Sequence, residues 1–119
     1  LIPMFIKSAY KKEPVFSNSK VIFTIGHNTF KEKMGADFLK LATINDYVTK
    51  KELESYKDNN NVAMFRGGAQ FADAITFGAD NVDKKLVEEF SKVKGKKILK
   101  FNPESDLTDY LQLFNDLAK

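Results

Sequence analysis

The residues of this chain that are best suited to bind a ligand lie in two turns, each of which begins with a glycine. Gly26, His27 and Asn28 follow an almost continuously apolar run, and Gly78 follows a second run of the same kind. A glycine at such a point leaves room for a ligand close to the backbone. A neutral imidazole can donate a hydrogen bond to a sugar hydroxyl or accept one from it near neutral pH. Gly26, His27 and Gly78 are therefore candidate binding residues, with a solvent-exposed loop histidine as the alternative interpretation of His27.

Other kinds of site find little support in the sequence. The chain has no cysteine and a single histidine, so a thiolate nucleophile is excluded and we expect no metal site. No Walker loop or GxGxxG fingerprint occurs, and we expect no cofactor. Asp80 and Glu104 could form a carboxylate pair of the glycosidase type, but capping of helix starts explains both residues more simply.

The elements that would position these residues alternate along the chain. Short apolar, β-branched runs at residues 20–25, 74–77 and 97–101 predict strands of the kind found in parallel sheets. Helical spacing falls between the runs. The helical segments that we expect are residues 3–12, a turn near 37–41, then 50–57, 62–72, 82–94 and a last helix from 103.

Capping residues, glycines and apolar spacing indicate where these helices begin and which of their faces are buried. Thr49 to Glu52 matches a capping box, and Asn81 and Asn102-Pro103 predict two further helix starts that could attract anions. Gly67-Gly68 inside a helix would cost about 2 kcal/mol in propensity, which a close approach to the sheet could explain. The expected buried faces are Ile2, Phe5, Ile6 and Ala9; Val62, Phe65, Ala69 and Ala72; Val82, Leu86, Phe90 and Val93; Leu107, Tyr110, Leu111, Phe114 and Leu117.

This order predicts an α/β, Rossmann-like three-layer αβα fold with a small parallel sheet of about three strands. No linker divides the chain, so we expect residues 1–119 to form a single domain, and three strands suggest a segment of a longer protein. Ligands of open parallel sheets bind beyond the carboxyl ends of the strands. That rule selects the turns at residues 26–28, 78–81 and 102–105.

Composition excludes several classes of protein. The net charge is +3, but the lysines are interspersed with 16 acidic residues and Arg66 is the single arginine. Because base and phosphate recognition favours arginine, we expect no nucleic-acid partner. No apolar run approaches the ~18 residues of a membrane helix, and the first residues lack the features of a signal peptide. Together with the absence of cysteine, this favours a cytoplasmic location.

Three motifs carry a family resemblance. "KVIFTIGHNTF" from residue 20, "VAMFRGGAQFADAITFGADNVDKKL" from residue 62 and "PMFIKSAYKKEPVFSNSK" from residue 3 resemble segments of the glycogen and starch synthase family. The similarity is greatest to compact, divergent glycogen-synthase-like proteins of Bacteroidetes-type bacteria. It spans most of the chain and corresponds to the C-terminal half of the family's N-terminal catalytic domain.

The resemblance implies a GT-B glycosyltransferase that moves glucose from a nucleotide sugar, typically ADP-glucose, to an α-1,4-glucan. His27 matches the family histidine that touches the donor glucose, and Asn28 matches its neighbour. Gly26 adds one residue before His27, and Gly78-Ala79 replaces the family's Ser-Pro. Because transfer needs groups from both lobes of a GT-B cleft, we expect this chain alone to be inactive.

A role without catalysis is the alternative. The chain would then bind glucan or a protein partner, or self-associate as a homodimer through an exposed sheet edge. Extension of the gene into a second Rossmann domain would favour the enzyme, and a stop soon after Lys119 would favour the binding module.

Overall fold

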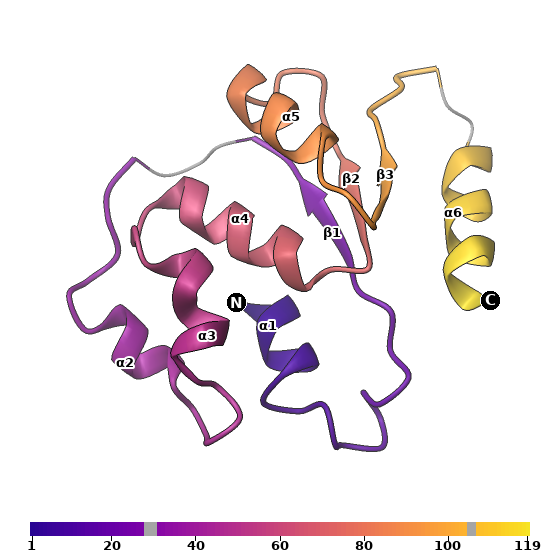
Figure 1. The fold of residues 1–119 in the computed structure, drawn as a ribbon. Helices are drawn as coiled ribbons and strands as arrows, with labels where there is room; N and C mark the ends of the chain where they lie inside the picture. Colours follow the sequence, from indigo (N-terminus) through magenta and orange to yellow (C-terminus); the bar gives the residue numbers. More distant parts are fainter. Residues whose placement is uncertain (28–30, 105–106) are drawn as a thin grey trace. The chain divides into compact units, whose positions relative to one another are not determined.

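The structure is a computed structural model that describes residues 1–27, 31–104 and 107–119. It divides into two compact units, which Figure 1 shows in one view. Unit 1 comprises Leu1–Ser19 and Thr29–Phe71, and unit 2 comprises Lys20–Asn28 and Ala72–Lys119. Within the described residues, no helix has the length and apolar character needed to cross a membrane.

Unit 2 contains the predicted parallel sheet. Its strands are β1 (Ile22–Ile25), β2 (Ala74–Phe77) and β3 (Lys97–Leu99), and they lie in the order β1-β2-β3. Ile25 pairs with Phe77, and Thr76 pairs with Leu99. The prediction of a small three-stranded parallel sheet, and with it the α/β, Rossmann-like class, is therefore confirmed.

Burial along the strands follows their place in the sheet. Every residue of the central strand β2 is buried, as expected for a strand covered on both faces. The outer strand β1 is covered only in part and exposes Thr24. The strands also begin later or end earlier than predicted, because residues 20–21 and 100–101 lie outside the ladder.

Helix α5 (Lys84–Ser91) follows β2, but it does not begin at Asn81. Asp83 is its N-cap, and the carboxylate of Asp83 accepts a hydrogen bond from the Lys85 amide at 2.8 Å. The prediction of Asn81 as the cap is therefore wrong by two residues. The expected inward face is largely correct, since Leu86 and Phe90 are buried.

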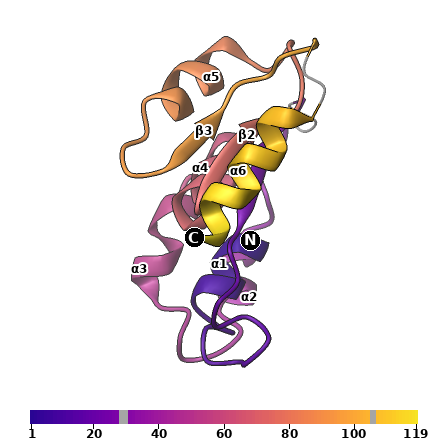
Figure 2. The same ribbon diagram turned by 90° about the vertical axis from the view of Figure 1, so that its right-hand side faces the viewer.

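Helix α6 (Thr108–Ala118) departs furthest from expectation. In Figures 1 and 2 it runs beside the outer strand β3. It does not begin at Asn102-Pro103, because the Asn102 side chain accepts a hydrogen bond from the Glu104 amide at 3.0 Å and closes a local turn instead. The predicted buried stripe is also wrong. Leu107, Leu111 and Phe114 are exposed, whereas Leu113 is the buried residue of the helix.

Unit 1 is helical and has its own core. Its elements are α1 (Ile2–Lys7), α2 (Phe38–Ala42), α3 (Lys50–Leu53), the 3₁₀ helix η1 (Glu54–Tyr56) and α4 (Asn61–Phe71). Helix α4 packs against α1 and η1. The buried residues that form the core are Met4, Ala9, Ala42, Val48, Leu53 and Tyr56.

Helix α1 is shorter than the predicted 3–12 segment, and it buries a different face. It ends at Lys7, and the hydroxyl of Ser8 donates to the Met4 carbonyl at 2.6 Å, which satisfies one carbonyl of the last turn. Pro3 and Met4 are buried, whereas Ile2 is 71% exposed. The predicted buried position of Ile2 is therefore wrong.

The capping box at the start of α3 is confirmed. The Thr49 amide donates to the Glu52 carboxylate at 2.9 Å, and the Thr49 side chain accepts a bond from the first turn. The Thr49 hydroxyl also donates to the Glu52 carboxylate, and this bond first, then the bond from the Thr49 amide, holds the pKa of Glu52 below its usual value. The helix then tightens into η1 before it reaches the predicted end at residue 57.

Gly67 is explained by an aromatic ring. A Cβ atom at Gly67 would overlap the ring of the fully buried Tyr56, which lies directly against this turn of α4. At Gly67, therefore, the contact that requires glycine is with η1 of the same unit. The helix–sheet approach expected from the sequence is not needed to account for this residue.

Candidate functional site

The carboxyl ends of the three parallel strands share one edge of the sheet in unit 2. Gly26 and Gly78 are the first residues beyond β1 and β2, directly after the paired residues Ile25 and Phe77. The Gly78 amide donates to the Ile25 carbonyl at 3.0 Å, so the ladder contact continues to this point. The structure therefore brings the two predicted glycine turns side by side.

Gly26 and Gly78 differ in whether the surrounding atoms leave room for a side chain. A Cβ atom at Gly78 would lie 2.9 Å from Cγ2 of Thr24, which is closer than real Cβ contacts allow. Thr24 is itself held, because its hydroxyl shares a hydrogen bond of 2.8 Å with the hydroxyl of Thr76. Packing within the sheet thus accounts for Gly78. A Cβ atom at Gly26 would meet open space, so nothing in the described surroundings demands glycine there.

His27 lies two residues beyond the end of β1 and is exposed. Its position at the carboxyl edge leaves the imidazole accessible to a ligand approaching the strand ends. Asn28, the other predicted residue of this turn, lies outside the described residues. Gly26, His27 and Gly78 are the predicted site residues that the structure places together.

The acidic residues near the same edge do not act as predicted. Asp80 and Glu104 are both exposed, and neither caps a helix. Because α5 starts at Lys84 and α6 at Thr108, no helix begins at Asn81 or at Pro103. Anion binding by helix dipoles at those two positions is therefore not supported.

The opposite, amino end of the sheet contains polar groups that sequence reasoning missed. The Asp73 carboxylate accepts from the Val21 amide at 2.7 Å, and the Asp73 amide donates to the Val21 carbonyl at 2.8 Å. The Lys96 ammonium group donates to the Ala72 carbonyl. These bonds fix where the strands begin, and an Asp placed just before an apolar run was the available signal.

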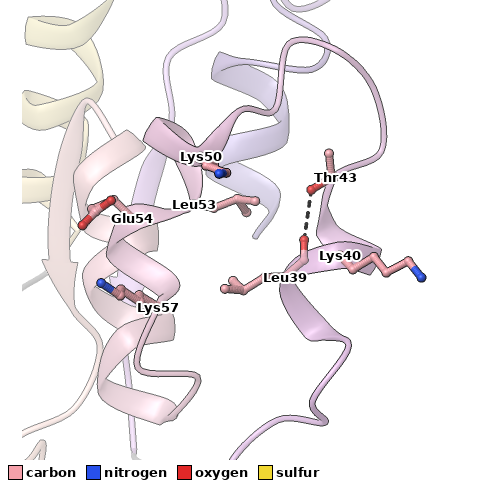
Figure 3. A pocket seen from close by; sticks show the side chains of 7 residues that line it. All are labelled: Leu39, Lys40, Thr43, Lys50, Leu53, Glu54 and Lys57. Carbon is pink, nitrogen blue, oxygen red and sulfur yellow. Dashed lines mark hydrogen bonds between the residues drawn. The ribbon is translucent and has the colours of Figure 1, made fainter.

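A pocket of about 450 Å³ lies in unit 1 between α2 and the α3–η1 segment. Figure 3 shows Leu39 and Leu53 extending toward each other across the gap, with Thr43 beside them. No sequence signal pointed to this pocket, because its walls come from a loosely patterned stretch. Within the described residues, no group of three His, Cys, Asp or Glu side chains could hold a metal ion.

The sequence of this chain is similar to known proteins of one family. The family model of the starch synthase catalytic domain matches residues 1–100. The glycogen synthases of Thermotoga petrophila and Thermotoga maritima are each 33% identical over 76 residues, which is 63% of this chain and 15% of each relative. The glycogen synthase of Desulforudis audaxviator is 29% identical over the same shares. No solved structure matches the chain.

Proposed function

This chain belongs to the starch synthase catalytic domain family, and on that premise we propose that it is part of a glycosyltransferase of glycogen synthesis. The reaction would transfer glucose from a nucleotide sugar, ADP-glucose, to an α-1,4-glucan. The family match over residues 1–100 carries the proposal, because it includes all three strands and the turn after β1. The proposal keeps the cytoplasmic location expected from the sequence.

Within this proposal, His27 contacts the donor glucose, and its sequence neighbours Gly26 and Asn28 are further donor-binding residues. Two observations support the assignment: His27 is exposed, and it lies at the carboxyl edge of a parallel sheet, where such folds bind ligands. An imidazole there can hydrogen-bond a sugar hydroxyl. Gly78 lies at the same edge, but the methyl group of Thr24 explains it, so its part is to bring the two turns together.

The test uses a longer protein that contains this chain and both lobes of the cleft. We expect glucosyl transfer from ADP-glucose to glycogen, and we expect His27→Ala to lower kcat/KM by about 100-fold, as loss of a transition-state contact does. Asp80→Asn at the same edge is the matched control and should keep the activity. Equal turnover in His27→Ala and the control would remove His27 from the site. A preference for UDP-glucose would correct the donor but leave the role of His27 intact.

The chain of residues 1–119 alone should be catalytically inactive, since donor phosphates and transition-state charge need groups from a second lobe. Calorimetric titration with ADP measures whether the chain alone binds the nucleotide part of the donor. We expect no saturable binding in the micromolar range, and a micromolar Kd would contradict this part of the proposal.

A second candidate is a binding role without catalysis, as an α/β module that associates with glucan, protein or a second copy. The observation that favours it is the exposed apolar side of α6 and of its N-cap residue: Leu107, Leu111 and Phe114 are 67%, 60% and 47% exposed. Such apolar clusters often mark interaction surfaces. Sedimentation of the chain at micromolar concentration tests its self-association. A monomer at all concentrations argues against a second copy as the partner.

A further inference from the structure

We propose that the pocket between α2 and the α3–η1 segment binds a small anion with an apolar body, such as a medium-chain alkyl phosphate or carboxylate. The residues that form the pocket all belong to unit 1, whereas His27 belongs to unit 2. Its volume of about 450 Å³ falls in the range of small-molecule sites. The residues that line it are Leu39, Lys40, Thr43, Lys50, Leu53, Glu54 and Lys57.

The centre of the pocket is apolar. In Figure 3, Leu39 from α2 and Leu53 from α3 extend toward each other across the gap. Leu53 is 8% exposed and belongs to the core of unit 1, so the apolar floor is anchored. Thr43 offers no free donor toward the gap, because its hydroxyl donates to the Leu39 carbonyl at 3.0 Å. An apolar group is the moiety that this centre would accept.

The margin of the pocket carries an excess of positive charge. Lys40, Lys50 and Lys57 contribute three ammonium groups, against one carboxylate from Glu54. Among the described residues, none of these three lysines forms an ion pair. In Figure 3, the Lys40 and Lys57 side chains point away from the gap on opposite sides, so each needs a change of rotamer to meet a ligand. Flexible four-carbon stems permit that movement.

This combination selects among ligand classes. A sugar would leave most of its hydroxyl groups without partners over Leu39 and Leu53, and burying unpaired polar groups is unfavourable. Among the residues that the structure describes, no aromatic side chain lines the pocket to stack on a sugar ring. A simple phosphate ion would use the lysines but not the apolar floor. A molecule with both an apolar body and an anionic group uses both features, and we infer that it binds as a free molecule.

The test follows the backbone amides of the 119-residue chain by NMR during titration with octyl phosphate below its micelle concentration. Two comparison ligands, 1-octanol and inorganic phosphate, each present half of the chemistry. We expect saturable shifts confined to residues 38–57 with octyl phosphate. We expect binding at least ten times weaker with either comparison ligand.

Variants assign the two halves of the site. The double variant Lys50→Gln, Lys57→Gln should weaken octyl phosphate binding at least fivefold and leave 1-octanol binding unchanged. The matched control Lys84→Gln, Lys85→Gln removes the same charge from α5 in the other unit and should bind like the original chain. An unchanged thermal midpoint in each variant shows that it is folded.

Three results would overturn the proposal. Equal affinity for 1-octanol and octyl phosphate would exclude a role for the lysines. Shifts that centre on Leu107, Leu111 and Phe114 would indicate adsorption to the exposed side of α6. Saturable shifts of the pocket amides with an acidic peptide or with anionic phosphatidylglycerol vesicles, but not with octyl phosphate, would assign the pocket to a macromolecule or a membrane surface.

Discussion

At the scale of single residues, the contact between Gly67 and the Tyr56 ring shows how strongly one position can be constrained. The ring is fully buried and lies where a side chain at position 67 would begin. The Tyr56 hydroxyl has no partner among the described residues, and burial raises the pKa of the phenol from its usual value of 10.0. Tyr56 therefore contributes to the core through the packing of its ring and not through a hydrogen bond of its hydroxyl.

Gly67→Ala should therefore destabilise the chain. Alanine improves helix propensity by about 1 kcal/mol, but displacing the Tyr56 ring in a packed core costs more, and we expect a net loss of about 2 kcal/mol in the free energy of unfolding. Urea denaturation followed by circular dichroism measures it. Gly35→Ala is the control: its new methyl group meets open space, so its effect should stay within about 0.5 kcal/mol. A Gly67→Ala variant as stable as the control would refute the ring contact.

At the scale of elements, the capping box couples the start of α3 to pH. The pKa of Glu52 is held below its usual 4.5 because the folded state donates hydrogen bonds from Thr49 to its carboxylate. A carboxylate with a depressed folded pKa stabilises the protein above the unfolded pKa, and this contribution is lost as pH falls through the folded value. The box should thus act fully at pH 7 and lose the contribution of Glu52 in acid.

Glu52→Gln keeps an oxygen that can accept from the Thr49 amide but removes the negative charge at the helix start, so it should lower the free energy of unfolding at pH 7 by about 0.3–1 kcal/mol. The difference from the original chain should shrink as pH falls through the lowered pKa of Glu52, because its carboxyl group then becomes neutral like the glutamine amide. Glu54→Gln, two residues later, removes a carboxylate without an ion pair among the described residues and serves as control. Urea unfolding at pH 7 and pH 3 decides the matter. A pH-independent difference would show that the carboxylate charge is irrelevant.

The same scale shows what the sequence could and could not predict. The strands and the capping box depend on local patterns, so residues 22–25 and 74–77 and the Thr49 cap were predictable. The start of α6 was not, because Asn102 can cap a helix or close a short turn, and only the surrounding chain selects the turn. An amphipathic stripe shows which residues share a side, but not which side is covered, and in α6 Leu113 is buried instead of Leu111.

The candidate sites divide in the same way. The edge that carries Gly26, His27 and Gly78 follows from a topological rule, since glycine turns after parallel strands must meet at one edge. The pocket between Leu39 and Leu53 could not be predicted, because its two walls are 14 residues apart in a stretch without a steady period. Three-dimensional packing alone brings these side chains face to face.

At the scale of the whole molecule, stability is distributed unevenly. The central strand β2 pairs with both β1 and β3, and all four of its residues are buried. Helix α6 is the opposite case, with Leu113 as its buried residue and its apolar stripe exposed. Because local opening is easiest where few apolar groups are buried, the two elements should differ widely in protection.

Amide hydrogen exchange should therefore be slowest in β2 and at least 100-fold faster in the middle of α6, since a gap of ~3 kcal/mol between local and global opening corresponds to that ratio. Exchange measured by NMR at pH 7 gives each amide separately. Ile75 and Thr76 report on the sheet, and Leu113 and Phe114 report on the helix. The capping-box helix α3 is an internal reference, because its exposed first turn should also exchange early. If Leu113 and Phe114 exchange as slowly as Ile75, the apolar side of α6 is covered in solution, and the binding role that its exposure favours would lose its support.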